Sequence, residues 1–154
     1  MLNGYKPYVT GDLMKALLDT GHGDRIAIVD GNFGARSHAK RKGQLVEVPS
    51  DDVVEVLEAV LDHGFPLDPA VYANELIVES IGRDFETDRA KEITRLLLDM
   101  ICREPDVLSE HIGQLEPERF RRAAEKAYAI VATKDPRHFG CVILTKGVLP
   151  DPTQ

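Results

Sequence analysis

The run Arg25–Val29, RIAIV, decides the fold that this sequence predicts. Its four consecutive apolar residues are rich in β-branched side chains, which is typical of a short strand buried inside a sheet. The run ends at Asp30, where an Asp-Gly pair predicts a turn. Before it, Asp12–Leu18 has apolar residues at helical spacing, with Thr10 as a candidate N-cap and Gly21 as a stop signal. A helix that leads into a buried strand favours an α/β protein.

The rest of the chain continues this alternation of helices and strands. We predict strands at Leu45–Val48, Glu75–Ile81, near Ile112, Tyr128–Thr133 and Cys141–Leu144. We predict helices from a Ser50 cap to about Leu61, over Asp88–Cys102, and over Pro117–Lys126. Residues 31–43 are rich in Gly, Ser and basic residues and indicate a loop. The pattern predicts an α/β sandwich with helices on both faces of a central sheet, formed by one domain over residues 1–154.

The composition excludes several classes of protein. The 154 residues carry 19 Lys and Arg against 26 Asp and Glu, a net charge of −7. This balance argues against a nucleic-acid partner, which needs a concentrated basic surface. The one basic run, Arg36–Lys42, indicates a solvated loop. No apolar run approaches the roughly 18 residues of a membrane span and no leader pattern is found, so we expect a cytoplasmic protein without a membrane partner.

The first candidate for chemistry is the imidazole of His22, in the sequence Gly21-His22-Gly23-Asp24 between a helix and a strand. Flanking glycines remove side-chain bulk, so a ligand could reach the ring. Histidine also titrates near neutrality, which suits a general acid or base. The alternative is a polar turn in which His22 only caps the preceding helix.

The second candidate is Asp30, at the carboxyl end of the first strand, where α/β proteins bind ligands. Its carboxylate could accept hydrogen bonds from two neighbouring hydroxyls; the alternative is an ordinary turn residue. His22 lies at the other end of the same strand, and eight extended residues would separate the two side chains by roughly 25 Å. If both serve one small ligand, they should come from different chains.

The third candidate is Phe139-Gly140-Cys141, which enters the last strand beside His138. A cysteine nucleophile partnered by His138 is one interpretation, and a buried small hydrophobic residue is the other. No CxxC pair and no histidine pair at helical spacing is present, so no metal site is predicted.

The opening MLNGYKPYVTGDLMKALLDTGHGDRIAIVDGNF and the closing AEKAYAIVATKDPRHFGCVILTKGVLP resemble the two ends of the ribose pyranase and fucose mutarotase (RbsD/FucU) family. The resemblance implies a three-layer α/β/α sandwich with a mixed central sheet. It also implies a ring-shaped homo-oligomer, commonly a decamer, with sites between subunits. The implied activity is interconversion of cyclic hemiacetal forms of a monosaccharide, with His22 as catalytic acid and base and Asp30 binding the sugar. No metal or organic cofactor is expected.

Four positions depart from the family pattern. Pro117 stands where the family has a basic residue, and Arg121 where the mutarotase branch has a tyrosine. Phe139 and Cys141 replace the Tyr and Asn of a Tyr-x-Asn motif. We expect these positions to line the sugar site, with Arg119 or Arg121 replacing the missing cation. Two functions follow: a mutarotase-like isomerase, or a non-enzymatic sugar-binding or regulatory protein on the same scaffold.

Overall fold

The computed structural model describes residues 2–78 and 89–154. The helices and strands follow one another along the chain in this order: α1 (Gly11–Asp19), β1 (Arg25–Val29), α2 (Ala35–His38), β2 (Leu45–Glu47), α3 (Val53–Asp62), β3 (Glu75–Ile77), α4 (Arg89–Ile101), the 3₁₀ turn η1 (Ser109–His111), β4 (Gly113–Leu115), α5 (Pro117–Glu125), β5 (Ala129–Ala132) and β6 (Val142–Thr145).

The strands form one six-stranded sheet in the order β2-β5-β1-β6-β3-β4. β1 pairs in parallel with β5, and β5 pairs in parallel with β2. β6 runs antiparallel to both of its neighbours, β1 and β3, so the sheet is mixed. The predicted central strand β1 therefore lies between β5 and β6. Its residues Ile26, Ala27, Ile28 and Val29 are fully buried.

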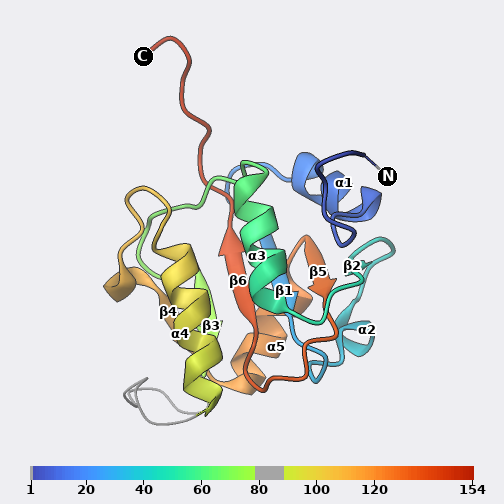
Figure 1. Cartoon of the computed structure of the whole chain (residues 1–154). Coiled ribbons are helices and arrows are strands. Elements are labelled where there is room, and N and C mark those ends of the chain that lie inside the picture. The colour runs from blue at the N-terminus through green and yellow to red at the C-terminus, as the bar shows by residue number, and fades with distance from the viewer. Residues whose placement is uncertain (1, 79–88) are drawn as a thin grey trace.

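The sheet separates two apolar cores. Helices α1, α3 and α4 contribute Leu13, Leu57 and Leu97 to the core on one face. Helices α2 and α5 cover the other face, where Phe120 packs edge-on against Phe33 with ring centroids 5.8 Å apart. In Figure 1, α3 and α4 lie in front of the sheet and α5 lies behind it. The predicted three-layer α/β/α sandwich with a mixed sheet is confirmed.

Local capping explains where several helices begin. Thr10 accepts a hydrogen bond from the backbone N–H of Leu13 at 3.1 Å, so the predicted N-cap of α1 is confirmed. At α3 the prediction was wrong by two residues, because Asp52 rather than Ser50 caps the helix. The Asp52 carboxylate accepts from the N–H of Val54 at 2.9 Å, and a negative charge there also complements the helix dipole.

Residues 31–43 are not entirely a loop, because they contain the short helix α2. The basic run is also tied to the fold. Arg36 pairs with Glu47 at 2.7 Å, and Arg41 donates to the carbonyl of Ala127 at 2.6 Å. These contacts hold the run against β2 and the end of α5.

The predicted strand over Glu75–Ile81 is confirmed as far as Ile77, and residues 79–81 lie outside the described residues. The last two strands occur where the sequence predicted them, each within about one residue at either end. Among the helices of residues 2–78 and 89–154, none is both long and apolar enough to cross a membrane.

Candidate functional site

The carboxylate of Asp30 lies at the carboxyl end of β1 and is only 5% exposed. One oxygen accepts a hydrogen bond from the N–H of Asn32 at 2.9 Å, and the other accepts from the N–H of Gly140 at 3.0 Å. These donors come from the turn that follows β1 and from the loop between β5 and β6. Asp30 is therefore held in one orientation before any ligand binds.

Burial raises the pKa of the Asp30 carboxyl above its usual 3.8, and the hydrogen bonds from Asn32, Cys141 and Gly140 only partly oppose this effect. Cys141 is 1% exposed, and its sulfur accepts from the N–H of Asp30 at 3.4 Å. Burial and then the Asp30 charge raise the pKa of the Cys141 thiol well above its usual range. A buried, neutral thiol is poorly suited to act as a nucleophile, which favours the interpretation of Cys141 as a packing residue.

A cavity of about 150 Å³ opens beside Asp30. Loops and helix starts at this end of the sheet supply its walls. The residues that line it are Asp30, Asn32, Phe33, Ile77, Pro117, Arg121, His138, Phe139 and Cys141. The structure therefore brings together four of the predicted site residues, Asp30, Arg121, Phe139 and Cys141. Arg119 is exposed and is not among the lining residues.

Two polar lining residues, Asn32 and His138, were not predicted as part of the sugar site, and neither were the apolar Phe33 and Ile77. Asn32 follows Asp30 by two positions, and its side-chain amide donates to the carbonyl of Pro136 at 3.3 Å. His138 immediately precedes Phe139 and was considered only as a partner for Cys141. The Asp-Gly-Asn turn was a usable signal for Asn32, because such turns present polar groups at strand ends.

The backbone at Phe139 and Gly140, beside the cavity, has an unusual conformation and packs tightly against neighbouring side chains. Phe139 has a φ of 62°, in the left-handed region that side chains other than Gly, Asn and Asp seldom adopt. The next residue has little room for a side chain, since a Cβ on Gly140 would lie 3.3 Å from a methyl carbon of Val53 and 3.4 Å from a side-chain carbon of Ile93, and these neighbours would have to shift slightly.

His22 lies at the opposite end of β1 in the turn that follows α1. Its side chain is 62% exposed, and its Nε2 lies 3.5 Å from an oxygen of Asp68. The turn itself is fixed, because Gly21 donates to Asp24 at 2.8 Å and Gly23 donates to the carbonyl of Lys146 at 2.9 Å. A free imidazole edge on a fixed backbone is an arrangement suited to proton transfer.

The alternative role for His22, capping α1, belongs to another residue. The ammonium of Lys146 donates to the carbonyls of Leu17 and Thr20 at 2.9 and 2.7 Å. These acceptors lie at the carboxyl end of α1, where a cation also complements the helix dipole. His22 is therefore not needed as the cap.

A second, shallow cavity of about 500 Å³ surrounds His22. Asp68, Glu104 and Asp106 give it an acidic lining, and the exposed Val148 and Leu149 of the C-terminal segment form part of its apolar wall. Asp68 was not predicted as a site residue, because it lies 46 positions after His22 in an irregular segment. The two cavities share no lining residue.

The described residues contain no cluster of three or more His, Cys, Asp or Glu side chains arranged to hold a metal ion.

A model of the RbsD / FucU transport protein family matches residues 4–149. The chain belongs to this family. It is 32% identical over 152 residues to the fucose mutarotase of Mus musculus, covering 96% of this chain and 95% of that protein. The predicted family resemblance is confirmed.

Two solved structures of the RbsD/FucU family resemble this chain closely. The fucose mutarotase from Streptococcus pneumoniae in complex with L-fucose is 29% identical, with a TM-score of 0.80; the match covers 97% of this chain and 100% of that one. FucU from Bifidobacterium longum is also 29% identical with a TM-score of 0.80, covering 95% of this chain and 100% of that one. The diverged positions Pro117, Arg121, Phe139 and Cys141 are all lining residues of the Asp30 cavity in this family member.

Proposed function

We propose that this protein interconverts the cyclic hemiacetal forms of a monosaccharide, such as fucose or ribose, with His22 as acid and base and Asp30 as the sugar anchor. The observation that carries the proposal is the near full-length similarity to a fucose mutarotase in a chain with an accessible imidazole and a preformed carboxylate acceptor. The cytoplasmic location expected from the sequence is part of the same proposal.

The reaction requires a group that protonates the ring oxygen and a base that removes the proton of the anomeric hydroxyl. The imidazole of His22 offers both a proton donor and a proton acceptor, and the carboxylate of Asp68 lies 3.5 Å from its Nε2. Free sugars already mutarotate slowly, so a positioned acid–base contributing about 10²–10⁴-fold is sufficient. Neither step requires a metal or an organic cofactor.

Asp30 suits the binding of hydroxyl groups, because a carboxylate accepts several hydrogen bonds. The remaining walls supply different chemistry. Arg121 offers N–H donors at the cavity, Phe139 offers an apolar ring edge, and Cys141 offers only a small buried surface. Arg119, two positions from Arg121 and exposed, would contact the sugar only from outside the cavity.

We propose that the complete site forms between subunits of a homo-oligomer, a decameric ring by family resemblance. The Asp30 cavity holds about 150 Å³, less than the roughly 300–1,000 Å³ of most ligand pockets, so another surface should complete it. Leu18, Val148 and Leu149 near the His22 end are 66–76% exposed and would be covered in such an assembly. Figure 1 shows the C-terminal segment extending away from the body of the subunit.

The catalytic claim is tested by saturation-transfer NMR on a panel of aldoses that includes L-fucose and D-ribose. We expect the wild-type protein to accelerate anomer or ring-form exchange of at least one sugar, and His22→Ala to lose the acceleration. His63→Ala is the matched control, because His63 is also exposed but its ring bonds the Ala59 carbonyl of its own helix. If the wild-type protein accelerates the exchange of none of the sugars, the proposed enzymatic activity is wrong.

The shared site is tested by mixing inactive subunits. His22→Ala and Asp30→Asn subunits co-expressed in equal amounts should regain about one quarter of wild-type activity, because each intact site needs His22 from one variant and Asp30 from the other. Either variant alone should be inactive. Absence of recovery in a particle shown by light scattering to contain both subunits would place the two residues in independent sites.

Sugar binding without catalysis is the second candidate. It is favoured by Phe139 and Cys141, which supply neither the hydroxyl nor the amide expected at these positions. Each buried polar group left without a partner costs about 1–3 kcal/mol, so a site that lost two could have lost its preference for the transition state. Thermal stabilisation by a sugar without accelerated exchange would support this candidate.

A further inference from the structure

The loop between β5 and β6, residues 133–141, carries three of the residues at the Asp30 cavity. It contains one side chain that is completely buried, the carboxylate of Asp135. A buried carboxylate requires donors on both oxygens, because its desolvation is costly. The contacts that Asp135 makes determine how this loop is held.

Asp135 accepts hydrogen bonds from two directions. One oxygen accepts from the N–H of Val53, the first residue of α3, at 2.9 Å. The other accepts from the backbone N–H of Arg137 at 2.9 Å, and the guanidinium of Arg137 reaches both oxygens at 2.6–3.2 Å. The loop is thus fixed on the start of α3.

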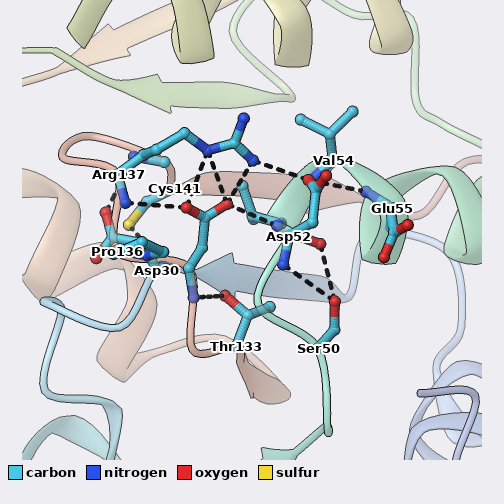
Figure 2. A network of polar contacts seen from close by, with 12 residues as sticks. Asp30, Ser50, Asp52, Val54, Glu55, Thr133, Pro136, Arg137 and Cys141 are labelled. Carbon is cyan, nitrogen blue, oxygen red and sulfur yellow. Dashed lines mark hydrogen bonds and ion pairs between the residues drawn. The ribbon is translucent and has the colours of Figure 1, made fainter. Parts of the chain in front are cut away.

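The guanidinium of Arg137 also bonds a second carboxylate. Its Nη2 donates to Asp52 at 2.8 Å, and Asp52 is the residue that caps α3. Figure 2 shows Arg137 lying across the helix start, with dashed contacts that reach Asp52. One cation therefore joins the carboxylate inside the loop to the carboxylate at the helix N-terminus.

The ion pair stays charged over the ordinary pH range. Burial opposes ionisation of Asp135, but the hydrogen bonds from Arg137 and Val53 outweigh it and lower the pKa of this carboxyl below 3.8. Hydrogen bonding to Asp135 raises the pKa of Arg137 above its usual value.

The clamped loop contacts Asp30 on two sides. The carbonyl of Asp135 accepts from the N–H of Gly31 at 2.8 Å, immediately after Asp30. The N–H of Gly140, at the other end of the loop, donates to the Asp30 carboxylate at 3.0 Å. A displacement of residues 135–140 would therefore move the Asp30 carboxylate and the cavity wall together.

We propose that Arg137 is a positioning residue for the sugar site: by joining Asp135 to Asp52 it fixes the loop that orients Asp30. Arg137 is not among the residues lining the cavity and makes no contact with substrate in this proposal. The proposal rests on the proposed function in one respect, namely that Asp30 anchors the sugar.

The test compares three variants. Arg137→Met removes the cation with its two carboxylate contacts, Arg137→Lys can keep one of them, and Asp52→Asn keeps the helix cap but weakens the contact to Arg137. We expect KM to rise about tenfold or more in Arg137→Met with a smaller change in kcat, and by intermediate amounts in the other two. Arg36→Met is the matched control, because it removes a surface cation that pairs with Glu47 away from the cavity.

A second readout does not depend on sugar. In ¹⁵N-resolved spectra of the folded protein, the amide signals of Gly31 and Gly140 should shift in Arg137→Met and stay in place in Arg36→Met. Unchanged KM and unchanged glycine signals in folded Arg137→Met would overturn the positioning role. If the wild-type protein neither binds nor converts any sugar, the proposed function fails, while the glycine signals still decide whether Arg137 sets the position of Asp30.

Discussion

The two ends of β1 carry the two candidate residues in opposite environments. Asp30 is 5% exposed and accepts two backbone hydrogen bonds. The side chain of His22 is 62% exposed, and its Nε2 lies 3.5 Å from the carboxylate of Asp68. The contrast fits the two proposed roles, because an anchor must be preorganised whereas a proton donor must remain accessible.

The largest expected effect comes from the accessible end. His22→Gln should lower the rate of sugar ring-form exchange by about 10²–10⁴-fold, because an amide cannot transfer the proton. The free energy of unfolding should change by less than about 0.5 kcal/mol, since the replaced ring is solvent-exposed. Exchange NMR and urea unfolding measure the two quantities. A large loss of stability would show that His22 is structural after all.

Asp30→Ala, unlike His22→Gln, should lower the stability of the folded protein. Removing the carboxylate leaves the N–H groups of Asn32 and Gly140 without their acceptor, which we expect to lower the free energy of unfolding by about 1–3 kcal/mol. Relief of a desolvated charge offsets part of the cost. Urea unfolding checks the value, and a stability equal to wild type would mean that the anchor is not held as tightly as its hydrogen bonds indicate.

Lys146→Met tests whether the contact of Lys146 with α1 holds the turn that carries His22. Methionine keeps much of the side-chain volume but removes the donor to the carbonyls of Leu17 and Thr20. We expect a loss of about 1–2 kcal/mol, because the last carbonyls of α1 lose a charged hydrogen bond. The rate of sugar ring-form exchange should fall less than in His22→Gln. Faster amide hydrogen exchange in residues 20–24 would locate the effect in the turn.

The prediction with the smallest effect at neutral pH concerns the protonation of Asp30. Because burial raises its pKa above 3.8, sugar affinity should decline as the pH falls through that raised pKa, where the carboxylate is protonated. The contribution of Asp30 to the free energy of unfolding depends on pH with the opposite sign. A carboxyl with a raised folded pKa favours the folded state below the unfolded value, and this contribution is lost as pH rises through the folded pKa. Sugar binding measured against pH tests the first expectation and urea unfolding measured against pH tests the second, and Asp30→Asn should lack both pH-dependent changes.

The sequence predicted those parts that local chemistry determines. The apolar run of β1, the Thr10 cap and the proline at the start of α5 each depend on neighbouring residues, and each occurs as predicted. The helix α2 was missed, because four residues give too little periodicity to distinguish a helix from a turn. Its position depends on contacts such as Phe33 against Phe120, which are distant in sequence.

The candidate site was predictable only in part for the same reason. Asp30, Arg121, Phe139 and Cys141 were identified from motif positions, and the structure places them around one cavity. Asp68 and the ion pair of Arg137 with Asp52 were missed, because the partners come from segments 46 and 85 positions away in the chain. Of the two arginines that the sequence offered as the cation, Arg121 on α5 lines the cavity and Arg119 does not.

The antiparallel strand β6 touches both halves of the candidate site. Cys141 and the loop before it contact Asp30, and Lys146, directly after the strand, fixes the turn that carries His22. The length of β6, four residues at a rise of about 3.3 Å per residue, sets the distance between these two contacts. In the proposed ring that separation would recur in every subunit, so inserting two residues into β6 would misalign every proposed intersubunit site at once.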